Sequence, residues 1–299
     1  MTDLHDIEPY PGICAPILLK HRLEDLWDKG MPPGDKTGWP SVDRHYTVVP
    51  GQVTIITGWP GSGKSEWLDA LLVNLSFQGW RTAIYSPENQ PLEVHTSKLL
   101  EKISGLPFGA GPSDRLPRAD MTAFLCEMQG KFAFVKMPEG GALSAAKVID
   151  AANGWLEEFK GQKRGLVIDP WNELEHHRPQ GISETEYISQ TLSHVRNWAR
   201  ANDVHVWIVA HPQKMRREEN GKLPVPRPDM ISGSQHWWNK ADCALTVWRD
   251  MEQPDSQNVE LHVQKVRFKH VGRPGIVDLQ YDRVTGRYHE PVRDIYAVK

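Results

Sequence analysis

The segment from Gly58 to Ser65 reads GWPGSGKS and matches the phosphate-binding pattern G-x-x-x-x-G-K-[ST] at every specified position. Glycines allow backbone N–H groups to turn inward around an anion without clashes from Cβ atoms. Lys64 would bring a positive charge to the β- and γ-phosphates, and the Ser65 hydroxyl would bind Mg²⁺. The pattern predicts binding and hydrolysis of ATP with Mg²⁺; the alternative is a chance match in a glycine-rich loop. The predicted nucleotide-binding residues of this loop are Gly58, Gly61, Ser62, Gly63, Lys64 and Ser65.

Three further polar residues stand where predicted strands end. Asp169, Glu88 and His211 follow apolar runs of strand type, which are Leu166–Ile168, Thr82–Ser86 and Val204–Ala210. The carboxyl ends of parallel strands meet at one edge of a sheet, so these side chains are expected beside the phosphate loop. We predict Asp169 as a metal ligand, Glu88 as the base that orients the attacking water and His211 as a sensor of the γ-phosphate. The alternatives are a turn aspartate, a solvated loop glutamate and a structural histidine.

The base and sugar of the nucleotide also need contacts. Arg249 and Tyr281 each end a late predicted strand and are candidates for stacking there. Placement at the surface, without a ligand, is the alternative for both.

The elements that must position these residues alternate between strand and helix. Val53–Thr57 is a buried-strand run before the phosphate loop, and Ser65–Gln78 has apolar residues at helical spacing after it. Later strands are expected at Phe132–Val135, Ala244–Trp248, Val259–Phe268 and Gly275–Tyr281, with helices at Leu92–Ile103, up to Met128, at Ala145–Phe159 and at Glu184–Ala201. This order predicts an α/β fold with a mainly parallel twisted sheet, helices on both faces and an antiparallel C-terminal tail.

Two units are expected along the chain. Residues 1–37 form an N-terminal segment, in which an amphipathic helix at Leu18–Lys29 precedes a glycine- and proline-rich connector. Residues 38–299 form the ATPase domain. The helix is expected to pack either on its own domain or on a neighbouring subunit.

A basic segment without acidic residues lies far from the phosphate loop, at Val263–Arg273. Alternation along a strand would put Lys265, Arg267 and Lys269 on one face. That face is either a solvated edge, on which lysine prevents aggregation, or the source of an arginine finger that acts on another subunit's nucleotide.

A long polar insert, Pro212–Asn239, is a candidate contact for DNA. Polar loops on a rigid scaffold are often functional, and basic loops that line a channel can follow a single-strand backbone. A surface loop without DNA is the alternative. The predicted DNA-binding residues are Lys214, Arg216, Arg217, Lys222 and Arg227.

The composition excludes several classes of protein. The net charge of −3 means that positive charge for nucleic acid must be concentrated locally. Three isolated cysteines predict neither a zinc site nor a disulfide framework. The chain shows no signal peptide and no apolar run of membrane-spanning length, so we expect a cytoplasmic protein of a bacterial or phage-infected cell.

Several ordered motifs resemble the RecA-like ATPase core of hexameric replicative DNA helicases, the DnaB/Twinkle group. The resemblance rests on residues 37–75 around the phosphate loop, on GWRTAIYSPENQPLE, on ISGSQHWWNKAD and on VQKVRF, the last of which resembles the family's K-x-R-F element. It covers roughly residues 38–290, and primase-helicases of phage and bacteria are nearest in kind. It implies that Lys265 and Arg267 reach the γ-phosphate of the neighbouring subunit. The implied catalytic residues are Glu88, Lys64, Asp169, His211, Lys265 and Arg267.

The resemblance implies a ring-shaped, ATP-driven translocase that moves 5′ to 3′ on single-stranded DNA and unwinds duplex DNA. Its partners would be single-stranded DNA, further copies of the chain in a hexamer, and a separate primase or loader. Family members usually carry an N-terminal primase or helical collar, and residues 1–37 are too few for either, so priming is not expected. The alternative from another class is a RecA-class scaffold, either a recombinase or a recombination mediator, which binds DNA under ATP control without processive unwinding.

Overall fold

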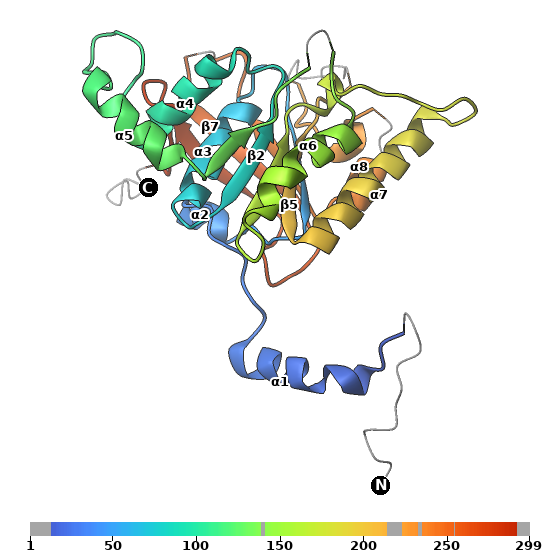
Figure 1. Cartoon of the computed structure of the whole chain (residues 1–299). Helices are drawn as coiled ribbons and strands as arrows, with labels where there is room; N and C mark the ends of the chain where they lie inside the picture. Colours follow the sequence, from blue (N-terminus) through green and yellow to red (C-terminus); the bar gives the residue numbers. More distant parts are fainter. Residues whose placement is uncertain (1–12, 139–140, 214–222, 233–234, 254, 292–299) are drawn as a thin grey trace, which may run out of the picture.

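The computed structural model describes residues 13–138, 141–213, 223–232, 235–253 and 255–291, and these ranges contain one twisted sheet between two layers of helices (Figure 1). In chain order, the strands of this part are β1 (Val53–Thr57), β2 (Arg81–Tyr85), β3 (Phe132–Phe134), β4 (Arg164–Ile168), β5 (Val204–Val209), β6 (Cys243–Trp248), β7 (Asn258–Val266), β8 (Gly275–Tyr281) and β9 (Tyr288–His289). They lie in the spatial order β3-β2-β4-β5-β1-β6-β7-β8-β9.

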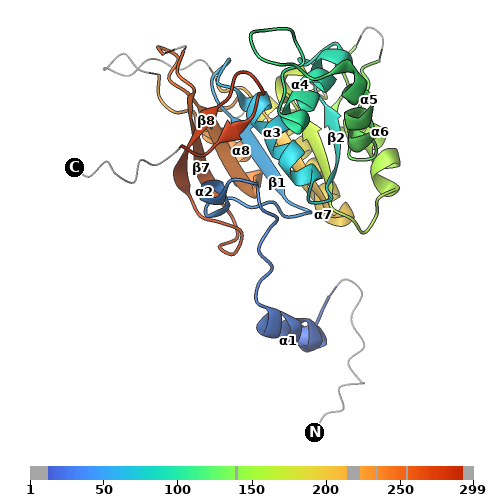
Figure 2. The ribbon, with the colours of Figure 1, turned by 90° about the vertical axis from the view of Figure 1, so that its left-hand side faces the viewer.

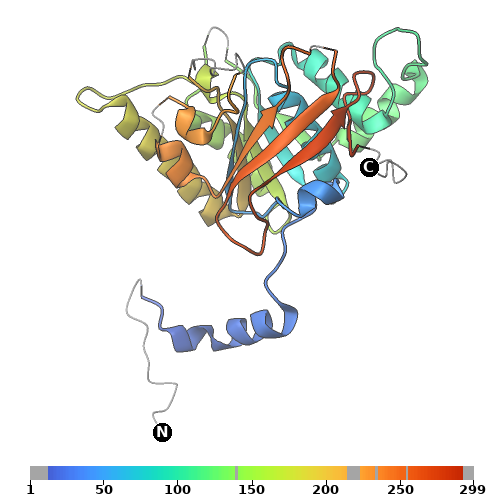
Figure 3. The same ribbon diagram turned by 180° about the vertical axis from the view of Figure 1, so that it is seen from behind.

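The direction of the strands changes at β6. From β3 to β6 in this spatial order, all neighbouring strands are parallel. The pairs β6–β7, β7–β8 and β8–β9 are antiparallel. All five residues of β1 and all six of β5 are buried, as expected for parallel strands covered on both faces. Figure 3 shows the antiparallel strands β7 and β8 from behind. The predicted fold class is therefore confirmed.

Helices cover both faces, and each face has its own apolar core. One core joins α3 (Lys64–Ser76), α4 (Leu92–Ser104) and α5 (Arg118–Met128) to the sheet, together with the short α2 (Pro40–Asp43). The other core joins α6 (Ala145–Glu157), α7 (Glu184–Asn202) and α8 (Gln235–Lys240) to the opposite face. Three short 3₁₀ segments, Pro16–Leu19, Trp171–Glu173 and Pro228–Met230, complete the described helical elements.

The N-terminal helix α1 (Lys20–Lys29) lies apart from the sheet domain (Figure 2). It starts two residues after Leu18, where the predicted helix began, and it ends at Lys29 as predicted. None of its residues is buried. Trp27 is 85% exposed and Leu23 is 55% exposed. No helix of the described ranges is long and apolar enough to cross a bilayer.

Two local predictions need correction. The polar insert is not all loop, because its end forms α8, in which Trp237 is fully buried against Trp171. The strand predicted to reach Phe268 ends at Val266 instead, and Lys269 lies in the turn that follows.

Candidate nucleotide-binding and catalytic site

The loop between β1 and α3 has the geometry of an anion cradle. Gly63 caps α3 with a φ of 90°, so the helix presents its N-terminus to the loop. Gly58 has a φ of 152°, and a Cβ atom there would lie 2.3 Å from the carbonyl oxygen of Val247. Position 63 therefore requires glycine for its backbone conformation. Position 58 requires glycine for its conformation and also because a Cβ atom has no space there.

Lys64 points into this loop. Its side chain is buried, and its Nζ donates to the carbonyl oxygens of Gly58 and Trp59 at 3.0 Å each. Burial lowers the pKa of Lys64 to about 8, against the opposing effect of Asp169 and Glu88. An ammonium group held in this position is placed for contact with a phosphate in the loop.

Asp169 follows β4 and lies beside the phosphate loop as predicted. Burial raises the pKa of its carboxyl to about 6, and a hydrogen bond from the Ser65 hydroxyl opposes that rise. Its Oδ2 accepts from Ser86 Oγ at 3.5 Å, whereas Oδ1 is buried and has no hydrogen-bond partner among the described residues. A buried carboxylate oxygen without a partner, next to a serine hydroxyl, fits Mg²⁺, which takes one or two protein oxygens and completes its shell with water and phosphate. Ser65 and Asp169 would hold that ion.

Glu88 and His211 meet at the same edge of the sheet. The Nε2 atom of His211 lies 3.4 Å from Glu88 Oε1, and the backbone N–H of His211 donates to Asn172 Oδ1 at 2.9 Å. The Glu88 side chain is 48% exposed. Burial, and then the charge of Lys64, lower the pKa of His211, although Glu88 opposes this. The histidine is therefore neutral at physiological pH.

The residues predicted to contact the base lie at this edge too. Strand β8 runs in the same direction as β6, so Tyr281 and Arg249 end on the side of the phosphate loop. The ring of Tyr281 lies 5.0 Å from that of Tyr288, whose hydroxyl donates to the Gly63 carbonyl oxygen at 3.4 Å. Burial raises the pKa of Tyr281 to about 12. Sequence reasoning missed Tyr288, because the two-residue strand β9 has no periodic pattern to reveal it.

Lys265 and Arg267 lie at the opposite edge. The backbone N–H of Arg267 donates to Asp242 O, and that of Asp242 donates to Val53 O, so Arg267 is level with the first residue of β1. Gly58 lies five residues further along, which is roughly 16 Å at about 3.3 Å per residue. Arg267 is therefore too far from the phosphate loop of its own chain to contact a nucleotide there.

The surroundings of Arg267 are crowded with positive charge. Its Nε lies 2.8 Å from Oδ1 of Asp242, a carboxylate with no exposed surface. Arg196 and Arg200 of α7 approach the same oxygen, at 3.6 and 3.3 Å. Lys265 donates to the carbonyl oxygen of Trp238. Arg196 and Arg200 were not predicted, because charged residues four apart on a helix usually mark a solvated face.

A β-bulge explains how these cations share a face. The register between β6 and β7 shifts at Ala244/Leu245, so Lys265 pairs with Ala244 and Val263 with Leu245. Ala244 belongs to the core beneath α7 and α8, whereas Leu245 belongs to the core beneath α3. The shift thus turns the end of β7 toward α7, and Lys269, in the following turn, does not share the strand face that simple alternation predicted.

Of the predicted DNA-binding residues, Arg227 is described and Lys214, Arg216, Arg217 and Lys222 lie outside the described residues. The guanidinium of Arg227 lies 5.2 Å from the ring centroid of Trp238 and its Nε lies 3.3 Å from Asp229 Oδ1. Lys265 Nζ lies 5.8 Å from the same ring. One end of the insert is thereby attached to the cationic end of β7.

Comparison with known proteins agrees with this geometry. No family model matches the chain. The chain is 36% identical, over 296 residues and 95% of its length, to the Twinkle homolog protein, chloroplastic/mitochondrial, of Arabidopsis thaliana. The match spans 41% of that protein, so the chain covers less than half the length of this relative.

Solved structures give the same fold. The ATPase domain of G40P superimposes with a TM-score of 0.75 at 18% identity, covering 91% of this chain and 98% of that one. A DnaB-like replicative helicase, described with its interactions with primase, gives 0.76 at 18% identity and covers 93% and 69%. These likenesses confirm the predicted resemblance to the DnaB/Twinkle group and the RecA-like fold.

Proposed function

We propose that this chain is an ATP-driven translocase on single-stranded DNA that unwinds duplex DNA at the expense of ATP bound with Mg²⁺. The observation that supports this most strongly is the meeting of Lys64, Asp169, Glu88 and His211 at one edge of a RecA-like sheet. The 36% identity with a Twinkle homolog supports a helicase over other P-loop ATPases.

Each residue of the site has a distinct part in hydrolysis. Lys64 binds the β- and γ-phosphates, and Ser65 and Asp169 would hold Mg²⁺, which would neutralise phosphate charge. The half-exposed carboxylate of Glu88 orients a water molecule and accepts its proton. The neutral His211, 3.4 Å from Glu88, reports the presence of the γ-phosphate to that carboxylate.

The catalytic cations Lys265 and Arg267 act on a neighbouring copy of the chain. The roughly 16 Å between Arg267 and Gly58 along β1 supports action in trans rather than in cis. The exposed apolar side chains of α1, including Trp27 and Leu23, support docking of this helix on a neighbouring copy of the chain. The proposed assembly is a hexameric ring that moves 5′ to 3′, with the basic insert from Pro212 onward facing the DNA strand in its channel. A separate primase or loader remains a predicted partner. A bacterial or phage-infected cell remains the predicted setting.

A forked-duplex unwinding assay tests this function. Parental protein with ATP and Mg²⁺ should release the displaced strand, and hydrolysis should rise when single-stranded DNA is added. The Glu88→Gln variant, which keeps the shape of the side chain but has no base, should bind ATP and DNA and release no strand. ATP hydrolysis without strand release would instead favour the RecA-class scaffold, and hydrolysis that ignores DNA would exclude both functions.

A further inference from the structure

The turn that carries Glu88 lies between β2 and α4. Its backbone is closed by a hydrogen bond from the N–H of Asn89 to the carbonyl oxygen of Ser86 at 3.3 Å. The carboxylate of Glu88 is half exposed and reaches His211 at 3.4 Å, so packing fixes it weakly. The position of the catalytic carboxylate therefore depends on what holds the turn.

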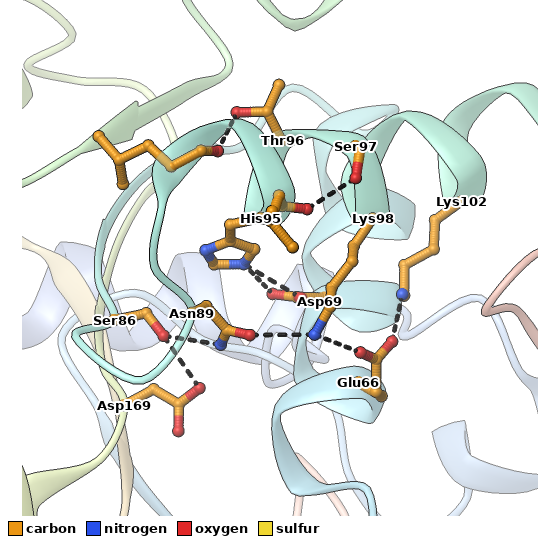
Figure 4. Close-up of polar contacts among 12 residues, drawn as sticks. Glu66, Asp69, Ser86, Asn89, His95, Thr96, Ser97, Lys98, Lys102 and Asp169 are labelled. Atoms are coloured by element: carbon orange, nitrogen blue, oxygen red, sulfur yellow. Dashed lines mark hydrogen bonds and ion pairs between the residues drawn. The ribbon is translucent and has the colours of Figure 1, made fainter. Parts of the chain in front are cut away.

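A line of polar contacts runs through this turn from the phosphate-loop helix to the metal-binding carboxylate (Figure 4). Glu66, next to Ser65 in the first turn of α3, lies 2.9 Å from Lys98 Nζ. Lys98 donates to Asn89 Oδ1 at 3.1 Å, and Asn89 Nδ2 donates to Ser86 Oγ at 2.8 Å. The Ser86 hydroxyl then donates to Asp169 Oδ2 at 3.5 Å.

We propose that Asn89 and Lys98 are positioning residues, which hold the Glu88 turn in register between the phosphate-loop helix and Asp169. The inference rests on the proposed function, because it takes Glu88 as the base that orients the attacking water. It adds that Glu88 is held by side chains on both sides of it, and that α4, through Lys98, is part of the catalytic apparatus.

The chemistry of Lys98 suits this role. The charges of Glu66, Asp69 and Asp169 raise its pKa although burial opposes them, so the ammonium keeps its charge and its hydrogen-bond donors. Two of those donors are directed to different elements, one to Glu66 on α3 and one to Asn89 on the turn. A side chain that bridges two elements fixes their separation, and displacement of a catalytic group by about 1 Å can lower a rate by roughly 10².

Lys102 provides a matched control on the same helix. It binds the other oxygen of Glu66, Oε2, at 2.6 Å, whereas Lys98 binds Asn89 as well as Glu66. Removing either lysine takes one ion pair from Glu66. Replacement of Lys98, unlike that of Lys102, also removes a hydrogen bond from the Glu88 turn.

The experiment compares single-turnover hydrolysis of ATP by the full chain, with DNA and Mg²⁺ present, in two backgrounds. Lys98→Met should lower the rate about tenfold in the parental background, a fraction of the roughly 10²–10⁴ that a general base supplies. In the Glu88→Gln background the same change should leave the residual rate unaltered, because the group it positions is already gone. Nucleotide affinity, measured by titration of a non-hydrolysable ATP analogue, should change less than twofold, and Lys98→Arg should restore much of the rate.

Asn89→Leu should reproduce the Lys98→Met pattern, since it removes the same link from the turn, and thermal unfolding of each variant checks that the fold is kept. Equal losses in both backgrounds, or an equal loss in Lys102→Met, would reduce the network to general support of the fold and overturn the proposal. If Glu88→Gln alone retained the parental rate, the proposed chemistry would fail first, so the two failures are separable.

Discussion

At the carboxyl edge of the parallel strands, Lys64 faces two carboxylates, those of Asp169 and Glu88, whereas at the amino edge one carboxylate, Asp242, faces several cations. The cations around Asp242 are Arg196, Arg200, Lys265 and Arg267. The carboxylates of the first edge are thus suited to bind a cation such as Mg²⁺ beside the anion cradle of the phosphate loop. The cluster around Asp242 at the second edge is basic and suited to bind an anion.

The crowding at the amino edge has an electrostatic consequence. Burial and the neighbouring guanidinium of Arg267 lower the pKa of Lys265, and burial lowers the pKa of Arg196 despite the presence of Asp242. An anion that approaches these cations reduces the repulsion between them. A basic cluster at the amino edge is expected if this edge of one copy meets the phosphates bound at the carboxyl edge of the next.

The largest expected effect comes from removing Arg267, the proposed finger of the amino edge. Arg267→Ala should lower hydrolysis by roughly 10³ or more, the range found for arginine fingers, while each subunit still binds ATP. Lys269→Ala is the matched control, because Lys269 lies in the turn after β7 and should leave the rate unchanged. Parental hydrolysis by Arg267→Ala would return this edge to the interpretation of a solvated strand.

Mixing two inactive proteins decides between action in cis and in trans. Arg267→Ala subunits mixed with Lys64→Ala subunits form some interfaces with an intact phosphate loop and an intact finger. After subunit exchange, phosphate release should exceed the sum of the two separate proteins. Rescue cannot occur if both residues serve the same subunit's nucleotide, so its absence under proven exchange would contradict action of the amino edge on a neighbouring nucleotide.

At the carboxyl edge, Lys64→Ala should weaken nucleotide binding and hydrolysis by about 10², because the buried ammonium is preorganised toward the phosphates. Titration with a fluorescent ATP analogue measures the affinity, and release of phosphate measures the rate. An affinity equal to that of the parent would show that the phosphates bind elsewhere.

Asp242→Asn probes how far the cation cluster around Arg267 depends on the carboxylate that its guanidinium groups share. The amide can still accept from the N–H of Val53, which lies 3.1 Å from Oδ2, but it leaves the guanidinium groups without a counter-charge. We expect a loss of about 2 kcal/mol in the free energy of unfolding, below the range for fully buried pairs because the arginines are partly exposed. Urea denaturation measures it, with the exposed Asp278→Asn on β8 as a control within about 0.5 kcal/mol of the parent.

The two edges also differ in how far the sequence predicts them. Asp169, Glu88 and His211 were found because each follows an apolar strand, and parallel strands bring their carboxyl ends together whatever the details of packing. The amino edge depends on the bulge at Ala244/Leu245, which turns Lys265 toward α7, and a one-residue shift of register has no local signal in the sequence.

The same distinction holds within the candidate catalytic site. The phosphate loop is a local motif, so its glycines and Lys64 follow from spacing alone. The link from Glu66 through Lys98 to Asn89 joins three elements by side chains that look like ordinary surface charges and a loop amide. Tyr288 likewise reaches Gly63 from a part of the chain 225 residues away. Contacts of this kind are set by tertiary packing.

The smallest expected effect extends the comparison to the basic insert, which joins the amino edge through Arg227 and Trp238. Replacing Lys214, Arg216 and Arg217 together should reduce the slope of log affinity for single-stranded DNA against log salt by about 2, at roughly 0.7 for each phosphate that the protein no longer neutralises. Raising the salt from 50 to 200 mM should therefore lower the DNA affinity of the variant about 20-fold less than it lowers that of the parent. Hydrolysis without DNA should stay near the parental rate, because none of these residues is assigned to the phosphate loop, the metal site or the finger. Fluorescence anisotropy of a labelled oligonucleotide over a salt series measures the slope. An unchanged slope would exclude this part of the insert as the contact with the DNA backbone. The proposed role of the amino-edge cations, contact with the neighbouring nucleotide, would not be affected.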